Sequence, residues 1–159
     1  IVYADDTLVL ANAGALVVSV WWDAPRPDQV HVVARQSKPI DARNNRRTAF
    51  AQFIVAGTPR FSSETRDAVT EIYESKLFRL GTAHIIEVGG LRGAATRAFL
   101  NTVTLLGRGS ERVKVFSTPD EGSEWVAGRL NYVAETTGVR WDGAGVMQVR
   151  AAAMAAREP

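Results

Sequence analysis

TAFAQFIVAGTPRFSSETRDAVTEIYESKLFRL, residues 48–80, is the segment from which the rest of the architecture follows. Its first part, Ala49–Val55, is short, apolar and rich in β-formers, which is typical of a strand buried on both faces. Gly57 and Pro59 end that strand, because proline cannot donate to a ladder and glycine permits the turn. A long amphipathic helix is predicted next, with Gly81 as its left-handed C-cap. Its apolar positions recur at helical spacing: Ala68, Val69, Ile72, Tyr73, Leu77 and Leu80.

Length and composition indicate one soluble, globular chain. It has 159 residues, of which 46% are hydrophobic and 23% are charged, and its net charge of +2 is too small to indicate nucleic-acid binding by itself. The absence of cysteine excludes disulfides, thiolate zinc sites and thiol catalysis. With only two histidines, His31 and His84, a histidine-rich metal site is not expected. The apolar run Ala15–Trp22 is too short to span a bilayer, so we expect a cytoplasmic protein.

Strand-like and helical patterns alternate along the rest of the chain. Two extended runs around the turn signal Asn12–Gly14 predict an antiparallel hairpin, in which the adjacent Trp21 and Trp22 face opposite ways. A thin apolar stripe predicts a helix from Pro27 to about Ser37, and a loop is expected from Pro39 to Arg47. Further strands and helices are predicted in the order Ala83–Val88, Leu91–Leu106, Val113–Phe116, a helix starting at Thr118–Pro119, and Met147–Arg157.

This order predicts an α/β fold. The elements follow the order β-β-α-β-α-β-α-β-α, which gives a mixed sheet of four to five strands with helices packed mainly on one face. The strands at 49–55, 83–88 and 113–116 are expected to be parallel. Residues 1–137 are expected to form the domain, and residues 138–159 a C-terminal extension whose short alanine-rich helix lies outside the core. The predicted core contains Phe53, Val55, Val69, Ile72, Leu77, Ile86, Phe99, Leu106 and Val115.

The element order and two short motifs resemble the STAS domain, named for sulfate transporters and bacterial anti-sigma factor antagonists. The first motif is Phe53-Ile54-Val55 followed by Phe61-Ser62-Ser63 and a helix, similar to the strand, Phe-x-Asp-Ser-Ser-Gly turn and helix of STAS antagonists. The second is Val115-Phe116-Ser117-Thr118 before a helix that contains Trp125. The resemblance covers roughly residues 1–133 and implies a protein-binding domain.

The same resemblance implies a role for the serine pair. In regulatory STAS members a partner kinase phosphorylates the serine of this turn, and the partner is then released. Arg60, Ser62, Ser63 and Glu64 are therefore the candidate switch or partner-binding residues. The chain departs from the family because no aspartate directly precedes the pair, and Glu64 stands where the family has glycine. Helix capping by one of the two serines is the simpler interpretation, and it is compatible with a switch.

A second candidate site is the glycine-rich turn that begins at Gly89-Gly90 and continues through Arg92 and Gly93 into a predicted helix. Its backbone N–H groups could cradle an anion, with Arg92 or Arg97 adding positive charge. The turn lacks the lysine and the Ser/Thr of a P-loop and does not match the dinucleotide fingerprint. Plain turn chemistry is the competing interpretation.

Tyr3-Ala4-Asp5-Asp6 is similar to the catalytic hairpin of reverse transcriptases, whose two aspartates and a third from an upstream strand hold Mg²⁺. Here the motif occupies the first residues, with no upstream strand to supply the third carboxylate. Coincidence is therefore the favoured interpretation, and neither a metal nor a cofactor is expected.

The sequence therefore favours a non-enzymatic function. No acid–base pair, nucleophilic triad or metal cluster can be nominated. We expect a regulatory or scaffolding domain that binds a protein partner, with serine phosphorylation as its expected control; nucleic acid is not an expected partner, and a homodimer is left open. The alternative is a carrier or sensor of a small ligand, apolar or nucleotide, held near the strand-to-helix turns.

Overall fold

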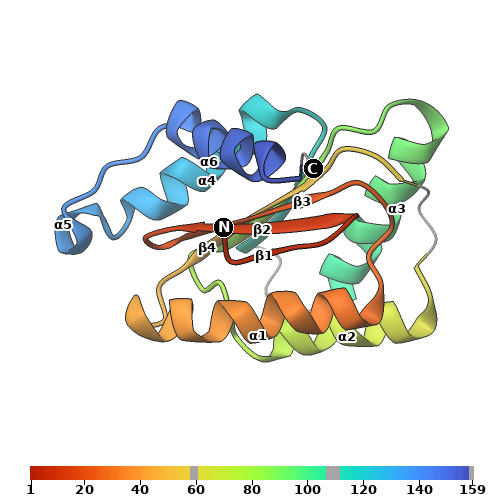
Figure 1. The fold of residues 1–159 in the computed structure, drawn as a ribbon, viewed down its shortest axis with the longest axis horizontal. Helices are drawn as coiled ribbons and strands as arrows, with labels where there is room; N and C mark the ends of the chain where they lie inside the picture. Colours follow the sequence, from red (N-terminus) through yellow and green to blue (C-terminus); the bar gives the residue numbers. More distant parts are fainter. Residues whose placement is uncertain (58–60, 107–111, 158–159) are drawn as a thin grey trace.

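The computed structural model describes residues 1–57, 61–106 and 112–157 of the chain. They form a single sheet between two layers of helices (Figure 1). The strands are β1 Tyr3–Ala4, β2 Leu8–Ala13, β3 Leu16–Trp21, β4 Ala49–Ile54, β5 Gly81–Ile86 and β6 Val113–Phe116. The helices are α1 Pro27–Arg43, α2 Ser63–Glu74, α3 Gly90–Leu106, α4 Pro119–Asn131, α5 Ala134–Thr137 and α6 Gly143–Ala155. Within the described ranges, no helix is long and apolar enough to cross a membrane.

The sheet is mixed, as the sequence predicts. Its strands lie side by side in chain order, from β1 to β6. β1, β2 and β3 are antiparallel neighbours, whereas β3, β4, β5 and β6 run parallel to one another. The predicted hairpin and the three predicted parallel strands are therefore confirmed. The sheet has six strands rather than four to five, and its outermost strand, β1, is only two residues long.

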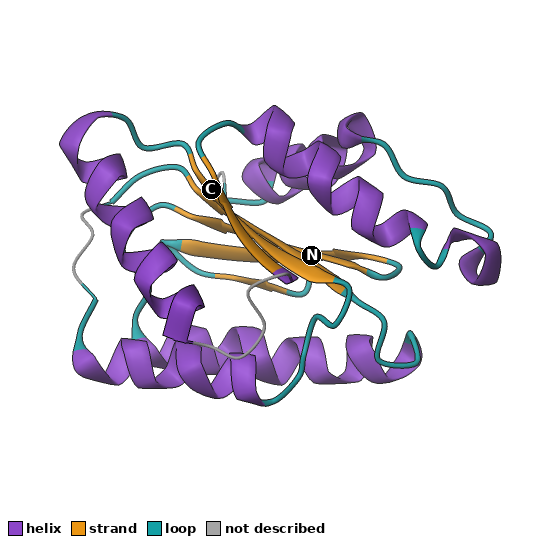
Figure 2. Cartoon of the chain, turned by 180° about the vertical axis from the view of Figure 1, so that it is seen from behind, coloured by secondary structure: helices purple, strands orange, loops and turns teal. Residues whose placement is uncertain are grey.

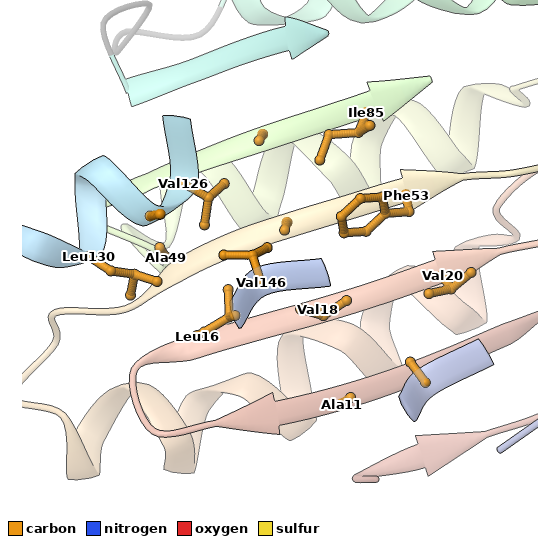
Figure 3. Packing of buried hydrophobic residues seen from close by; sticks show 14 of the residues in the cluster. Ala11, Leu16, Val18, Val20, Ala49, Phe53, Ile85, Val126, Leu130 and Val146 are labelled. Carbon is orange, nitrogen blue, oxygen red and sulfur yellow. The ribbon is translucent and has the colours of Figure 1, made fainter. Parts of the chain in front are cut away.

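Helices cover both faces of the sheet, so the prediction that they pack mainly on one face is wrong (Figures 1 and 2). Phe53, Ile85 and Leu16 pack with residues of α4 and α6 on one face (Figure 3). On the other face Trp21 and Phe50 pack with residues of α1, α2 and α3. The reason lies in the central strands, β3, β4 and β5, whose residues are all buried. Strands that are apolar on both faces need a helix layer on each side.

The C-terminal helix α6 belongs to the core, so the prediction that Met147–Arg157 lies outside it is wrong. Val146 and Ala153 are fully buried and pack with the residues of β2 and β3. Arg150 donates two hydrogen bonds to the carboxylate of Glu87, at 3.0 and 2.7 Å. The small alanine side chains let the helix lie close to the strands, so a few larger residues are enough to dock it.

The first helix is longer than its thin apolar stripe predicts. α1 runs through Pro39 to Arg43, where a loop is expected from the sequence. Ile40, directly after the proline, is almost fully buried, and Asp41 accepts a hydrogen bond from the Thr48 hydroxyl at 2.6 Å. Packing of this last turn against the sheet offsets the backbone hydrogen bond that Pro39 cannot donate.

The helix after the serine pair is shorter than predicted. α2 ends at Glu74, and Gly81 is the first residue of β5 rather than a helix cap. Lys76 and Phe78 have positive φ angles, of 57° and 56°, which break the helical course. Phe78 is thereby buried against Phe50, with the ring centroids 4.5 Å apart. Burial of an aromatic ring outweighs the helical periodicity of this segment.

Two of the nine predicted core residues are confirmed as buried, and both lie on the central strands. Phe53 and Ile86 are buried. The side chains of Phe99 and Leu106 lie outside the described part of the chain. The other predicted core residues are half-buried and pack against the two clusters or line a cavity beside them: Val55, Val69, Ile72, Leu77 and Val115.

Candidate functional site

The serine pair begins α2, beyond the carboxyl ends of the parallel strands β3 and β4. Ser62 is the N-cap residue, and its hydroxyl accepts a hydrogen bond from the backbone N–H of Thr65 at 3.1 Å. Thr65 is itself buried, and its hydroxyl donates to the carbonyl of Pro25, in the loop after β3, at 3.3 Å. The predicted capping role is therefore confirmed and belongs to Ser62. The cap also ties the start of α2 to the neighbouring strand's loop.

Ser63 and Glu64 are exposed in the first turn of α2. The backbone N–H of Glu64 and the hydroxyls of Ser62 and Ser63 hydrogen-bond to the Glu64 carboxylate, and these bonds lower the pKa of Glu64. A negative charge is thus already held where the helix dipole favours it. Arg60, the remaining candidate switch residue, lies outside the described residues. The structure therefore brings Ser62, Ser63 and Glu64 together on one exposed turn.

The glycine-rich turn begins α3, with Gly90 at a positive φ of 64°. A Cβ at Gly93 would lie 1.8 Å from the carbonyl oxygen of Val88, so only glycine allows this approach of helix and strand end. Arg92 is exposed and Arg97 half-buried. Close packing thus accounts for Gly93, and anion binding at this turn stays a prediction.

Asp5, the first residue of the aspartate pair near the N-terminus, has a structural role. The Asp5 carboxylate accepts hydrogen bonds from the backbone N–H groups of Thr7 and Leu8, both at 2.8 Å. It also accepts from the Tyr3 hydroxyl at 2.9 Å and from the Gln29 amide at 2.8 Å. Asp5 therefore joins the turn between β1 and β2 to the first turn of α1. Among the described residues, no three acidic, histidine or cysteine side chains are grouped to hold a metal ion.

Asp5→Asn is expected to remove an acid-sensitive part of the stability. Burial alone would raise the pKa of Asp5, but the hydrogen bonds from Gln29, Thr7 and Tyr3 lower it from 3.8 to about 2. The stabilisation is present above about pH 4 and is lost as the pH falls to about 2, and after solvent screening of this partly exposed carboxylate it amounts to about 1 kcal/mol. Urea unfolding at pH 7 and at low pH measures it. The neighbouring variant Asp6→Asn, at an exposed residue, should keep the wild-type pH dependence; equal behaviour of the two variants would contradict the assignment.

Three largely buried polar side chains form a hydrogen-bonded row beneath α2. This row was not identified as a site from the sequence. His84 of β5 lies next to Gln52 of β4 in the sheet register. The Nδ1 atom of His84 is 2.5 Å from Oε1 of Gln52, and its Nε2 atom is 2.6 Å from the hydroxyl of Tyr73 in α2. Because an amide oxygen only accepts, Nδ1 carries the proton and Nε2 accepts from the Tyr73 hydroxyl.

Burial determines the protonation states of His84 and Tyr73. It lowers the pKa of His84 to about 4 and raises that of Tyr73 well above its ordinary value. At neutral pH the imidazole is uncharged and the phenol keeps its proton. Gln52 and His84 occupy matching mid-strand positions of two mainly apolar parallel strands, and a polar residue at each of these positions is the signal that the sequence offers. No known protein-family model matches the chain, and comparisons with curated proteins and with solved structures found no match.

Proposed function

We propose that this chain is a non-enzymatic regulatory or scaffolding domain that binds a protein partner through the first turn of α2. The observation that carries the proposal is that the two serines have different roles at the start of α2. The Ser62 hydroxyl caps the helix, whereas Ser63 is exposed at the first helical position and its side chain hydrogen-bonds to the Glu64 carboxylate rather than to the backbone of the first turn. The side chain of Ser63 is thus available for modification without loss of the helix start.

Phosphorylation of Ser63 is the proposed control of this surface. A phosphate there meets the free N–H groups of the first turn and the positive end of the helix dipole, so it does not unfold α2. It also stands directly beside the Glu64 carboxylate, and like charges this close repel each other. The phosphorylated first turn of α2 would then present a partner with more negative charge than the unmodified turn, and with that charge differently placed. The position supports this role, since open α/β sheets tend to bind at the carboxyl ends of their strands.

The test separates capping from partner binding. Ser62→Ala should lower the free energy of unfolding by about 1 kcal/mol, because the cap is lost, while Ser63→Ala should change it by less than about 0.5 kcal/mol. In affinity capture from the native cells, Ser63→Asp should fold normally but lose a partner that wild type and Ser63→Ala both retain. Equal capture by Ser63→Asp and Ser63→Ala would leave capping as the whole role of the pair.

A further inference from the structure

A cavity lies between the sheet and the helices α1, α2 and α3, directly beside the Gln52–His84–Tyr73 row. Its volume is about 50 Å³, room for a few water molecules. Its walls are mainly aromatic and aliphatic, with Trp21, Phe50 and Phe78 from the sheet side and Val69 and Ile72 from α2. Such a mainly apolar space with a few convergent polar groups is the usual form of a small-molecule site.

The polar groups of the cavity have hydrogen-bonding capacity left over. Gln52 is 9% exposed and uses its amide oxygen for the bond from His84. Its amide nitrogen, with two hydrogens to donate, makes no hydrogen bond within the described part of the chain. Thr82, buried in β5, adds a hydroxyl to the same wall. The amide donor of Gln52 keeps a little exposed surface, since this residue is 9% exposed, and it can donate to a ligand oxygen that enters the cavity.

The charge of the lining defines the ligand further. None of the described residues around the cavity is lysine, arginine, aspartate or glutamate, and its one histidine is neutral at pH 7. A nucleotide or another anion would lose its hydration here without gaining a counter-charge. The ligand must therefore be uncharged.

We infer that this cavity is a binding site for a small, uncharged, ring-bearing molecule with one hydroxyl or carbonyl oxygen. The ring packs against the aromatic side chains, and the oxygen accepts a hydrogen bond from the amide nitrogen of Gln52. This site is separate from the surface of α2 proposed to bind a partner, and the inference does not rest on that proposal.

Entry of a ring requires the cavity to widen, and α2 is the wall that moves. An apolar cavity of about 150 Å³ is needed to hold benzene, several times the present volume. Only Thr65 and Ala68 of α2 are buried, and the helix packs mainly on α1 rather than on the strands. Its inner side chains that line the cavity, Val69, Ile72 and Tyr73, are half-buried. A small outward shift of α2 enlarges the cavity at the expense of the hydrogen bond between Tyr73 and His84, while the sheet and the other helices stay in place.

The probes are phenol, benzene and benzoate, titrated into the ¹⁵N-labelled protein and followed by NMR, with thermal unfolding as a second readout. Phenol should bind saturably, shift the side-chain amide signals of Gln52, and bind at least about ten-fold more tightly than benzene, which offers no oxygen. Benzoate should not bind. Benzoate binding as tight as that of phenol, or equal affinities for phenol and benzene, would overturn the assigned ligand class.

Two matched substitutions locate the binding. Val69→Phe fills the cavity from α2 and should weaken phenol binding at least about ten-fold. Val139→Phe makes the same change at an exposed position outside the cavity and should leave the affinity unchanged. The inference is overturned if wild type shows no saturable binding of phenol, or if both variants bind phenol as wild type does.

Discussion

Removal of α6 is expected to lower the free energy of unfolding by more than about 5 kcal/mol, which is enough to unfold many domains of this size. Val146 and Ala153 have no exposed surface, and both belong to the core cluster that contains Leu16 and Val18 of β3. Figure 3 shows Val146 above these two side chains. Without the helix, the apolar face of β2 and β3 would be open to water. Each fully buried aliphatic side chain that becomes exposed costs about 1.5–3 kcal/mol.

The loss of Arg150 adds an electrostatic cost to the same deletion. Its guanidinium makes a two-pronged ion pair with Glu87, and both side chains are largely covered, with 15% and 19% of their surface exposed. Deletion leaves the Glu87 carboxylate without this partner. Urea unfolding of a variant that ends at Trp141 measures the effect, and a variant that ends at Ala155, which keeps the helix, is the control. A cooperative transition in the shorter variant, with a urea midpoint close to that of wild type, would show that α6 is dispensable.

Phe53→Ala should be among the most damaging single truncations of a core side chain, at about 3–5 kcal/mol. Phe53 is fully buried at the centre of the sheet, and the guanidinium of Arg150 lies 5.3 Å from the centroid of its ring. Its removal leaves a cavity between β4 and α6 and takes away the ring over which Arg150 packs. The midpoint of urea unfolding, with the slope of the transition checked for change, reports the loss.

The matched comparison is Phe116→Ala, at the edge strand β6. Phe116 is half-buried and packs beside Trp125, so its truncation should cost about 1–2 kcal/mol. Equal costs for the two phenylalanines would mean that burial in the sheet centre does not decide stability here.

Local chemistry made much of this fold predictable. The signals that succeeded depend only on residues that are close in the sequence: the apolar run Ala49–Val55 and the cap residues Ser62 and Thr118. Thr118 accepts from the Glu121 N–H, as its spacing predicts, and Pro119 is the first residue of α4. Strand positions and helix starts could be read from such signals because their physical causes are contained in short segments.

The predictions that were wrong for α1, α2 and α6 share a different cause, which is contact between segments far apart in the sequence. Ile40 carries α1 past Pro39, Phe78 ends α2 early, and Val146 docks α6, and each does so through a contact with a distant strand. A single sequence does not show these contacts, so the sequence pattern predicted the wrong ends for α1 and α2 and the wrong role for α6. The same holds for the polar row beneath α2. Gln52 and His84 are 32 residues apart, and only the pairing of β4 with β5 makes them neighbours.

The strand order allows the sheet to form in sequence order, from the N-terminal strands to the C-terminal ones. Because the strands stand in the sheet in the order in which they occur in the sequence, each new strand can join the edge of a sheet already formed. Such nearest-neighbour pairing limits the sequence separation of paired strands to one connection, so the sheet can grow in order while the chain leaves the ribosome. α6 is the exception, because it is made after β6 yet covers β2 and β3. Until it arrives, the oldest part of the sheet stays uncovered, and the nascent protein passes through a stage in which it is prone to aggregate.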